Sequence, residues 1–566
     1  MLSAIKDLGK FVIDNNLAIS SPMRGVVLSI VIDVKNASFA GIDIEDFDSK
    51  KLGQYLFKQG ASKGNAPSPF CPLTKPQKTL KKIARWLKQC NELSDLQKND
   101  MLFLNQALEI LKANEGGIVS EIEKKSKNLL KKKGEANFLT LKFNDKYIGE
   151  YEIFNKCLIT FNEAKRKKSA SLGTCSICGL PGKEVSGKTD VYKFYTIDKP
   201  GFIIGGFQES LAWKNFPVCQ ECKISLEKGK EFLENHLSFN FYGLGYYLIP
   251  RFLIGNGDEL KEILQILSDT TKAVSLKGRI KKRITSDENE ILEYISEKKD
   301  ILSLTFLFLR RDQSAERILL LIEDVFPSRI RKIFEGKEYV ERIFAEEFNF
   351  GKIRTFFSKS DESKRQSDLN EYFLAIVDSI FKDRELDFSF LSKFYMAVIR
   401  KEFIKDGYFY FRIKDSLMDT MFFENLGLIT FKEVENMEES IFDSIFARYG
   451  KSLGSPIKRG IFLLGALTQL LLNKQWSERN AKPFMKKLKG LKMDEKDIKA
   501  LLPEVQNKLE EYNAFDKGKK LVAAEASKYL LEAGDIWKMS IDEINYYFAC
   551  GMNLAESVAN IVYSVN

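Results

Sequence analysis

Histidine is nearly absent from this chain of 566 residues, which contains only His236. Zincins and metal-dependent phosphohydrolases use several histidines, and a Ser-His-Asp hydrolase needs one beside its nucleophile, so these enzyme classes are mostly excluded. His236 stands in Glu234-Asn-His-Leu-Ser, where we interpret it as a surface or capping residue rather than a catalytic one. The composition therefore predicts that the protein is not an enzyme.

Long apolar segments are missing as well. The longest run, Ile461–Leu472, is shorter than the ~20 residues that a membrane-spanning helix needs. The N-terminal residues lack the apolar core and cleavage site of a signal peptide. The chain has only 13 prolines and no low-complexity tract, which argues against long disordered regions. We therefore expect a soluble, cytoplasmic protein made of several globular domains.

The excess of positive charge is small. The chain has 88 basic and 78 acidic residues, a formal net charge of +10, and 44% hydrophobic residues with 44 phenylalanines. This composition is ample for sizeable cores. It favours a polyanionic partner only where the basic residues cluster.

Four of the eight cysteines form two pairs of the pattern Cys-X-X-Cys, Cys175-Ser-Ile-Cys178 and Cys219-Gln-Glu-Cys222. Two such turns supply the four thiolates that tetrahedral zinc prefers. Core thiols or a redox pair are the alternatives, but a redox site needs only one pair. Because four protein ligands leave no open position, we predict a structural zinc ion. The other four cysteines are scattered, as is usual in a reducing cytoplasm.

A candidate nucleic-acid site lies in the N-terminal third. A loop rich in glycine, serine and proline, residues 58–70, precedes a segment whose apolar residues recur at helical spacing from Gln77. Basic residues share the outer face of this helix, which can neutralise a phosphate backbone or simply be solvated. The loop can approach a groove closely. The predicted contacts are Lys58, Gln59, Ser62, Lys63, Asn65, Lys78, Lys81, Lys82 and Arg85.

One motif is misleading. Gly182-Lys-Glu-Val-Ser-Gly-Lys-Thr189 matches the P-loop pattern letter for letter. A working P-loop leaves a buried strand and opens a helix, so that backbone amides hold the phosphates. Here the pattern follows a cysteine turn and runs into residues 191–195, which alternate like a strand. We therefore do not interpret it as a nucleotide site.

The remaining patterns predict an α+β fold. Residues 26–34 and 39–47 read as a hairpin, as do 138–148, and 98–133 read as one helix. Residues 301–309 and 317–325 read as paired core strands, with Pro327 starting a helix. We expect an N-terminal α+β region at 1–169, a zinc-ribbon-like unit at 170–230, the rest of an α+β core at 231–360, and a helical bundle at 370–566.

Four stretches in order resemble the large subunit of type I-B CRISPR Cascade complexes, the Csh-type family. They are Tyr55–Asn65, the Cys175–Cys222 unit, Thr305-Phe-Leu-Phe with Ile318–Ser328, and Tyr546–Leu554. The resemblance implies a non-catalytic subunit that recognises the motif flanking a target in double-stranded DNA, helps open the duplex and stabilises the R-loop.

The resemblance also implies the partners. They are CRISPR RNA, target DNA, the backbone and RNA-end-binding subunits, helical small subunits, and a helicase-nuclease recruited in trans. It further implies that a helical C-terminal piece can be made separately from an internal start, for which we favour Met437 over Met418 and Met421.

Two other readings stay open. A polymerase-like CRISPR large subunit would need a metal-binding palm, but Gly205-Gly206 is followed by Phe207 and Gln208, which cannot bind that metal, so its active site would be lost. A free-standing zinc-ribbon protein would bind nucleic acid without partners and without motif preference.

Overall fold

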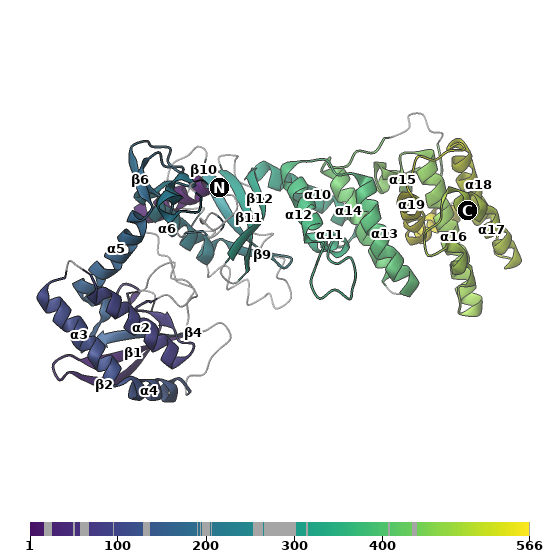
Figure 1. Cartoon of the computed structure of the whole chain (residues 1–566). Coiled ribbons are helices and arrows are strands. Elements are labelled where there is room, and N and C mark those ends of the chain that lie inside the picture. Colours follow the sequence, from purple (N-terminus) through teal and green to yellow (C-terminus); the bar gives the residue numbers. More distant parts are fainter. Residues whose placement is uncertain are drawn as a thin grey trace. The chain divides into compact units, whose positions relative to one another are not determined.

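The fold was obtained as a computed structural model, shown in Figure 1. The structure describes the chain except for residues 16–24, 49–50, 57–66, 94–95, 128–135, 190, 193, 195–203, 205, 253–263, 265–301, 313–314, 406–407, 433–438 and 565–566. The chain divides into two compact units. The first contains Met1–Asn240, Leu244–Ser275 and Leu304–Leu321, and the second consists mainly of Ile322–Asn566.

The first sheet of the first unit confirms both predicted N-terminal hairpins. Its strand order is β2-β1-β4-β3, and β5 pairs with β4. The hairpin turn after β4 contains Asn144, whose φ of 54° suits asparagine. Strand β1 also pairs in parallel with β4, which the sequence did not predict. The bounds are β1 Gly25–Asp33, β2 Ser38–Asp46, β3 Cys71–Pro72, β4 Ala136–Phe143 and β5 Lys146–Tyr147.

Helices α2 (Pro76–Asn91), α3 (Lys98–Ala113), α4 (Glu115–Lys127) and α5 (Glu152–Lys167) pack against this sheet. Successive side chains of a strand point to opposite faces of the sheet, so Leu28, Ile30 and Ile32 of β1 share one face. All three are buried in one core with these helices. The single helix predicted over 98–133 is wrong. The chain breaks at Asn114, whose side-chain amide donates to the Ile110 carbonyl and whose φ is −108°.

The cysteine pairs lie in a part of the first unit that also contains helices α1 and α6. Helix α1 (Leu2–Asp14) packs on α6 (Gln220–His236) and on strand β10. A three-stranded sheet has the order β6-β7-β8, and a four-stranded sheet has the order β12-β11-β10-β9, which confirms the predicted strand pair. The bounds are β6 Ala170–Gly173, β7 Lys183–Ser186, β8 Val218–Cys219, β9 Ser238–Phe241, β10 Leu244–Phe252, β11 Leu302–Asp312 and β12 Ala315–Val325.

The second unit is helical, as the sequence predicted for the C-terminal part. Pro327 occupies the first turn of α10, and Ser540 forms the predicted capping box with Glu543 at the start of α19. The bounds are α10 Pro327–Phe344, α11 Phe350–Phe356, α12 Asn370–Lys382, α13 Phe388–Lys405, α14 Phe409–Asn425, α15 Asp443–Arg448, α16 Pro456–Arg479, α17 Glu495–Glu511, α18 Lys517–Glu532, α19 Ile541–Asn553 and α20 Ala555–Ser564.

The polar stretch between α11 and α12, which its composition favours as a linker, lies inside the second unit. The Lys401 ammonium donates to the Ser360 carbonyl at 3.1 Å, and Lys405 pairs with Glu362 at 2.7 Å. Both lysines belong to α13, so the stretch is held on that helix. Among the described residues, no helix is long and apolar enough to cross a membrane.

Candidate metal centre and nucleic-acid interface

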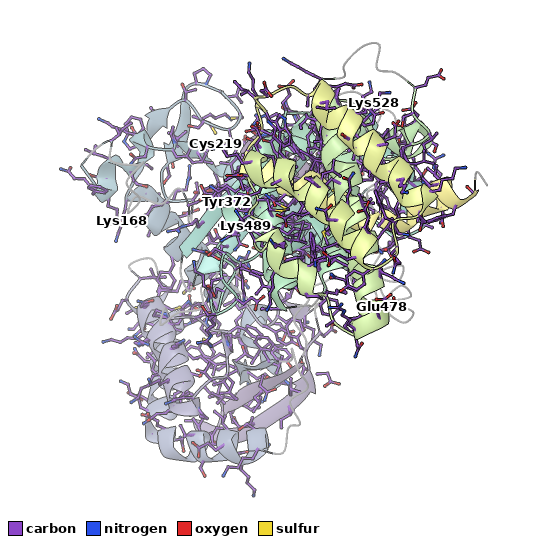
Figure 2. All side chains as sticks on the ribbon, turned by 90° about the vertical axis from the view of Figure 1, so that its right-hand side faces the viewer. Lys168, Cys219, Tyr372, Glu478, Lys489 and Lys528 are labelled. Atoms are coloured by element: carbon purple, nitrogen blue, oxygen red, sulfur yellow. The ribbon has the colours of Figure 1, made fainter. Side chains whose placement is uncertain are left out.

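The two cysteine pairs converge on one point in the first unit. The sulfur atoms of Cys175, Cys178, Cys219 and Cys222 all lie within 4.8 Å of one another, and Cys219 is labelled in Figure 2. Four sulfurs placed ~2.3 Å from one zinc ion would stand ~3.8 Å apart. The spacing therefore fits a metal ion bound by four thiolates, as the sequence predicted.

Backbone hydrogen bonds hold the first cysteine turn in shape. The Gly179 amide donates to the Cys175 carbonyl at 2.9 Å, and the Cys175 amide donates to the Leu180 carbonyl at 3.1 Å. Gly179 has a φ of 72°, a conformation that glycine adopts without strain. The second pair is placed by β8, which ends at Cys219, and by the first turn of α6, which carries Cys222.

The thiols do not ionise equally in the absence of a cation. Burial opposes ionisation of Cys175, but backbone N–H groups of Cys178, Cys219 and Ile177 outweigh it and lower its pKa to about 7. Burial raises the pKa of Cys222, and the negative charge of Cys175 raises it further. The Cys175 thiolate thus forms easily and disfavours ionisation of Cys222, and a cation bound between them favours both thiolates.

Lys6 is a neighbour of the metal centre that the sequence did not reveal. Its pKa is raised, first by a hydrogen bond to Asp7 and also by the charges of Cys222 and Cys178. Lys6 also forms an ion pair with Asp7, which balances much of its charge. No local pattern marks Lys6, because it reaches the site only through the packing of α1 on α6.

The predicted basic helix exists and forms one side of a groove. Leu80, Ile83, Trp86 and Leu87 of α2 are buried, as the periodicity predicted. The opposite side of α2 and part of α3 enclose about 700 Å³. The lining residues are Lys78, Lys81, Lys82, Ala84, Arg85, Lys88, Asn91, Asn105, Leu108 and Lys112.

The groove is lined by six basic residues and no acidic one. Two carboxylates reach it from outside, since Glu115 lies 3.8 Å from Lys81 and Glu92 lies 3.8 Å from Lys88. Both pairs are exposed, and such pairs contribute only about 0–1 kcal/mol, so a phosphate can displace either carboxylate. The groove can therefore bind a polyanion.

Several residues of this groove were not among the predicted contacts. Lys88, Asn91, Asn105 and Lys112 line it together with the predicted residues, and the Asn91 amide donates to the Asn105 side-chain carbonyl at 2.7 Å. The basic stripe of α2 already contained Lys88. Asn105 and Lys112 belong to α3 and become neighbours only when the two helices pack.

The predicted loop contacts lie outside the described residues: Lys58, Gln59, Ser62, Lys63 and Asn65 fall within residues 57–66. The described residues on either side of this segment are held together. The rings of Tyr55 and Phe70 stack with centroids 5.6 Å apart, and Phe70 stacks on Phe138 of β4 at 5.0 Å. Strand β3 follows Phe70 and leads into α2, so the segment precedes the basic helix in the sequence.

The P-loop look-alike forms part of a sheet, and two acidic residues of β2 bind neighbouring side chains. Residues 183–186 form β7, which pairs with β6 and β8, so the pattern does not open a helix. On β2, Glu45 accepts hydrogen bonds from Lys51 and from the Tyr55 hydroxyl, and Asp43 pairs with Lys142. These contacts account for both carboxylates without a metal ion.

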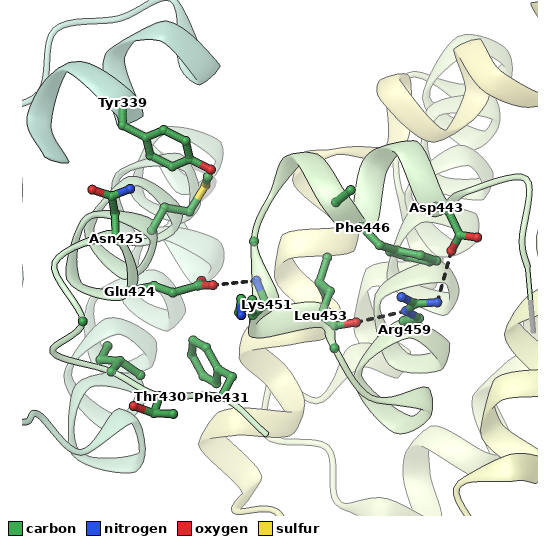
Figure 3. Close-up of a pocket in the computed structure, with 16 residues that line it drawn as sticks. Tyr339, Glu424, Asn425, Thr430, Phe431, Asp443, Phe446, Lys451, Leu453 and Arg459 are labelled. Atoms are coloured by element: carbon green, nitrogen blue, oxygen red, sulfur yellow. Dashed lines mark hydrogen bonds and ion pairs between the residues drawn. The ribbon is translucent and has the colours of Figure 1, made fainter. Parts of the chain in front are cut away.

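The second unit contains a cavity of about 820 Å³, drawn in Figure 3. Charged side chains that line it have hydrogen-bond partners within the protein. The Lys451 amide donates to Glu424 at 2.7 Å, and Arg459 donates to Asp443 at 3.2 Å and to the Leu453 carbonyl at 3.0 Å. Since these groups already have protein partners, we assign no ligand to this cavity.

Comparison with known proteins places the chain in a family. No curated protein matches it. Three family models for the CRISPR-associated protein TM1802 match consecutive parts of the sequence: the N-terminal domain over residues 1–160, the central domain over 172–325 and the C-terminal domain over 348–565. The central domain contains the four-cysteine centre, and the N-terminal domain contains the basic groove. Because the three matches together cover nearly the whole chain, the protein belongs to the CRISPR-associated TM1802 family.

Proposed function

We propose that this chain is the non-catalytic large subunit of a type I-B RNA-guided surveillance complex. It recognises the short motif flanking a target in double-stranded DNA, helps open the duplex and stabilises the R-loop. A separate helicase-nuclease is recruited in trans and cuts. The observation that carries the DNA contact is the α2–α3 groove, with six basic lining residues and no acidic one.

Phosphate contacts fix the position of a protein on DNA, whereas contacts with base edges provide sequence preference. The groove supplies the first kind. We assign the second kind to the loop at residues 58–65, because it leads into the basic helix and its amide and hydroxyl groups can pair with base edges. Tyr55 and Phe70, which are described on either side of this segment, stack on each other.

The ion at the cysteine centre is, in this proposal, structural zinc. Thiolate sulfur is a soft ligand that favours zinc over magnesium or calcium, and four such ligands leave no position for a substrate or a water. The centre connects β6–β8 with the N-terminus of α6 and so fixes the fold around it. The ion therefore contributes structure rather than chemistry.

The C-terminal helices favour one internal start over its rivals. Met418 and Met421 lie within α14 and are buried, so a start there would begin inside a helix. Met437 lies outside the described residues, but in the sequence it falls between α14 and α15. Helices α17, α18, α19 and α20 all pack on α16. A piece beginning at Met437 therefore keeps this packing intact.

This internal start has its own test. Replacing Met437 by leucine should remove a co-purifying C-terminal fragment from the expressed protein, as measured by intact mass spectrometry. Met421→Leu should leave that fragment in place. A fragment that persists in Met437→Leu and disappears in Met421→Leu would contradict the assignment.

The function itself is tested by co-expressing the chain with its neighbouring Cas proteins and a CRISPR RNA. Gel-shift binding to a matched duplex should depend on the flanking sequence and should be lost when this chain is omitted. The triple variant Lys81→Gln, Lys82→Gln and Arg85→Gln should weaken binding on all flanking sequences alike. Cutting of DNA by this chain alone would favour an enzymatic subunit, and purification without RNA or other Cas proteins would favour a free-standing zinc-ribbon protein.

A further inference from the structure

Three large apolar side chains lie exposed at one end of α13 and α14 in the second unit. Ile404 is 73% exposed, Tyr408 66% and Phe411 58%. The layer beneath them is packed, since the buried rings of Phe403 and Phe409 lie 4.9 Å apart. Clusters of this kind on a folded surface usually mark a binding site, because leaving them in water is unfavourable.

A turn with four exposed lysines lies beside Ile404, one of these side chains. Lys486, Lys487, Lys489 and Lys492 are all exposed, and residues 482–492 contain no acidic residue. The turn is fixed on α13, because the Arg400 side chain donates to the Leu491 carbonyl at 2.7 Å. It also reaches the apolar cluster, since a Cβ atom on Gly490 would lie 4.0 Å from the Ile404 side chain. Lys489 is labelled in Figure 2.

The acidic groups around this surface do not block it. Lys487 pairs with Glu504 at 3.1 Å and Lys489 pairs with Asp497, with both lysine side chains about 60% exposed. Exposed pairs of this kind contribute only about 0–1 kcal/mol and yield to a phosphate. Glu402 accepts the Tyr408 amide at 3.0 Å and so holds the start of α14.

We propose that this surface binds a single nucleic-acid strand. Unpaired bases stack on the rings of Tyr408 and Phe411, and the lysines of the adjacent turn bind the phosphates. The two rings have centroids 6.1 Å apart and are tilted by 56°. The Lys414 ammonium lies over the Phe411 ring, 5.3 Å from its centroid, so a base that stacks on Phe411 uses the opposite face. Base–aromatic stacking needs bases whose faces are free, which a duplex does not offer.

The lysines favour a nucleic acid over a protein as the ligand of this surface. An apolar patch alone fits many proteins, but four exposed lysines without an acidic neighbour in their own turn complement a chain of phosphates. The site lies in the second unit, whereas the groove of the proposed function lies in the first. An R-loop displaces one DNA strand, so the inference rests on the proposed function and deepens its R-loop part, while strand binding can be tested apart from motif recognition.

The test uses the full-length chain and a fluorescein-labelled oligo(dT) strand, with binding followed by fluorescence anisotropy. The double variant Tyr408→Ala and Phe411→Ala should weaken binding at least about fivefold, since each stacked base contributes ~1–3 kcal/mol. Changing the four lysines to glutamine should reduce the slope of log K against log salt by up to about 3. Each phosphate contact on a single strand contributes ~0.7 to that slope.

Matched controls lie elsewhere in the same unit. Leu531 and Ile536 are 78% and 82% exposed, and their replacement by alanine should leave binding unchanged. Lys517 and Lys520 of α18 are exposed, and their replacement by glutamine should leave the salt dependence nearly unchanged. Thermal unfolding followed by circular dichroism checks that every variant is folded.

Three results would overturn the inference. The first is unchanged oligo(dT) binding by the folded Tyr408→Ala and Phe411→Ala variant. The second is complete loss of oligo(dT) binding on neutralising Lys81, Lys82 and Arg85 alone, which would assign it to the α2–α3 groove. The third is a Tyr408→Ala and Phe411→Ala variant that binds oligo(dT) normally but no longer co-purifies with other Cas proteins. That result would identify the surface as a protein interface. Motif-dependent duplex binding by the assembled complex reports on the proposed function separately.

Discussion

Gly9 of α1 lies directly against Gly229 of α6. A Cβ atom on Gly9 would stand 2.6 Å from the Gly229 amide nitrogen and 1.7 Å from the Ser225 carbonyl oxygen. The two backbones therefore touch, which only glycine permits. This contact fixes the N-terminal helix on the helix whose first turn carries Cys222, and it brings Lys6 towards the metal centre.

Replacing Gly9 by alanine should destabilise the first unit. The new methyl group meets backbone atoms that cannot rotate away, and overpacking of this kind typically costs ~1–3 kcal/mol. Thermal unfolding of the full-length chain measures the effect. The control is Gly116→Ala in α4, where no atom lies within 4 Å of the added carbon. That control should be neutral or slightly stabilising, and equal melting of the two variants would contradict the close contact.

Loss of one cysteine ligand should release the metal. Cys219→Ser removes a thiolate from the four-sulfur centre, so we expect the metal content of the purified chain to fall from about one ion to near zero, with a lower melting temperature. Elemental mass spectrometry reads both the amount and the identity of the ion. Cys71→Ser is the matched control, because Cys71 is buried in β3 outside the centre. Full zinc content in Cys219→Ser would show that the ion binds elsewhere.

Lys112 should contribute to DNA binding although it lies outside the basic helix. It lines the α2–α3 groove from α3. Lys112→Gln should weaken binding of the assembled complex uniformly across flanking sequences and reduce the salt slope by about 0.9, the value for one phosphate contact on duplex DNA. Lys124→Gln, on the exposed side of α4, is the control. An altered motif preference in Lys112→Gln would contradict a pure phosphate contact.

Asp419 should make the second unit more stable in acid than at neutral pH. Its side chain is fully buried, neither carboxylate oxygen has a hydrogen-bond partner, and burial followed by the charge of Asp415 raises its pKa well above the usual range. The folded chain therefore binds a proton here that the unfolded chain releases above pH ~4. Stability should fall as the pH rises from ~4 towards the folded pKa, by up to about 1.4 kcal/mol per pH unit.

Urea unfolding of Asp419→Asn across this pH range tests that sign. The stabilisation of the variant over the wild type should be small near pH 4 and should grow as the pH rises, because asparagine carries no charge to bury. Asp415→Asn is the control. It loses a 2.7 Å pair with Lys352 and should be destabilised at neutral pH. A gain for Asp419→Asn that shrinks with rising pH would refute the assignment of a protonated Asp419.

Local chemistry made much of the fold predictable. The buried stripe of α2, the turn at Asn144, Pro327 at the start of α10 and the capping box at Ser540 each depend on residues close in the sequence. The four cysteines were predictable for the same reason, since each pair sits in one turn and tetrahedral binding requires two pairs.

What the sequence did not reveal depends on packing between distant segments. The parallel pairing of β1 with β4, the contact of Gly9 with Gly229, and the arrival of Lys6 at the metal centre all join segments that no local pattern links. The sequence around Lys112 does not distinguish it from other exposed helical lysines. It lines the groove only because α3 packs beside α2. The break at Asn114 was missed because the apolar spacing continues across it and only the side-chain hydrogen bond to Ile110 marks the end.

The central claim is that this chain gives an RNA-guided complex its preference for a flanking motif. The most direct measurement is selection of bound duplexes from a library with a fixed matched target and a randomised flank, using the complex assembled with and without this chain. The account predicts strong enrichment of a short motif that vanishes when the chain is omitted, and weaker binding without a changed motif when Lys81, Lys82 and Arg85 are neutralised. The same motif enriched by the complex that lacks this chain would contradict the account.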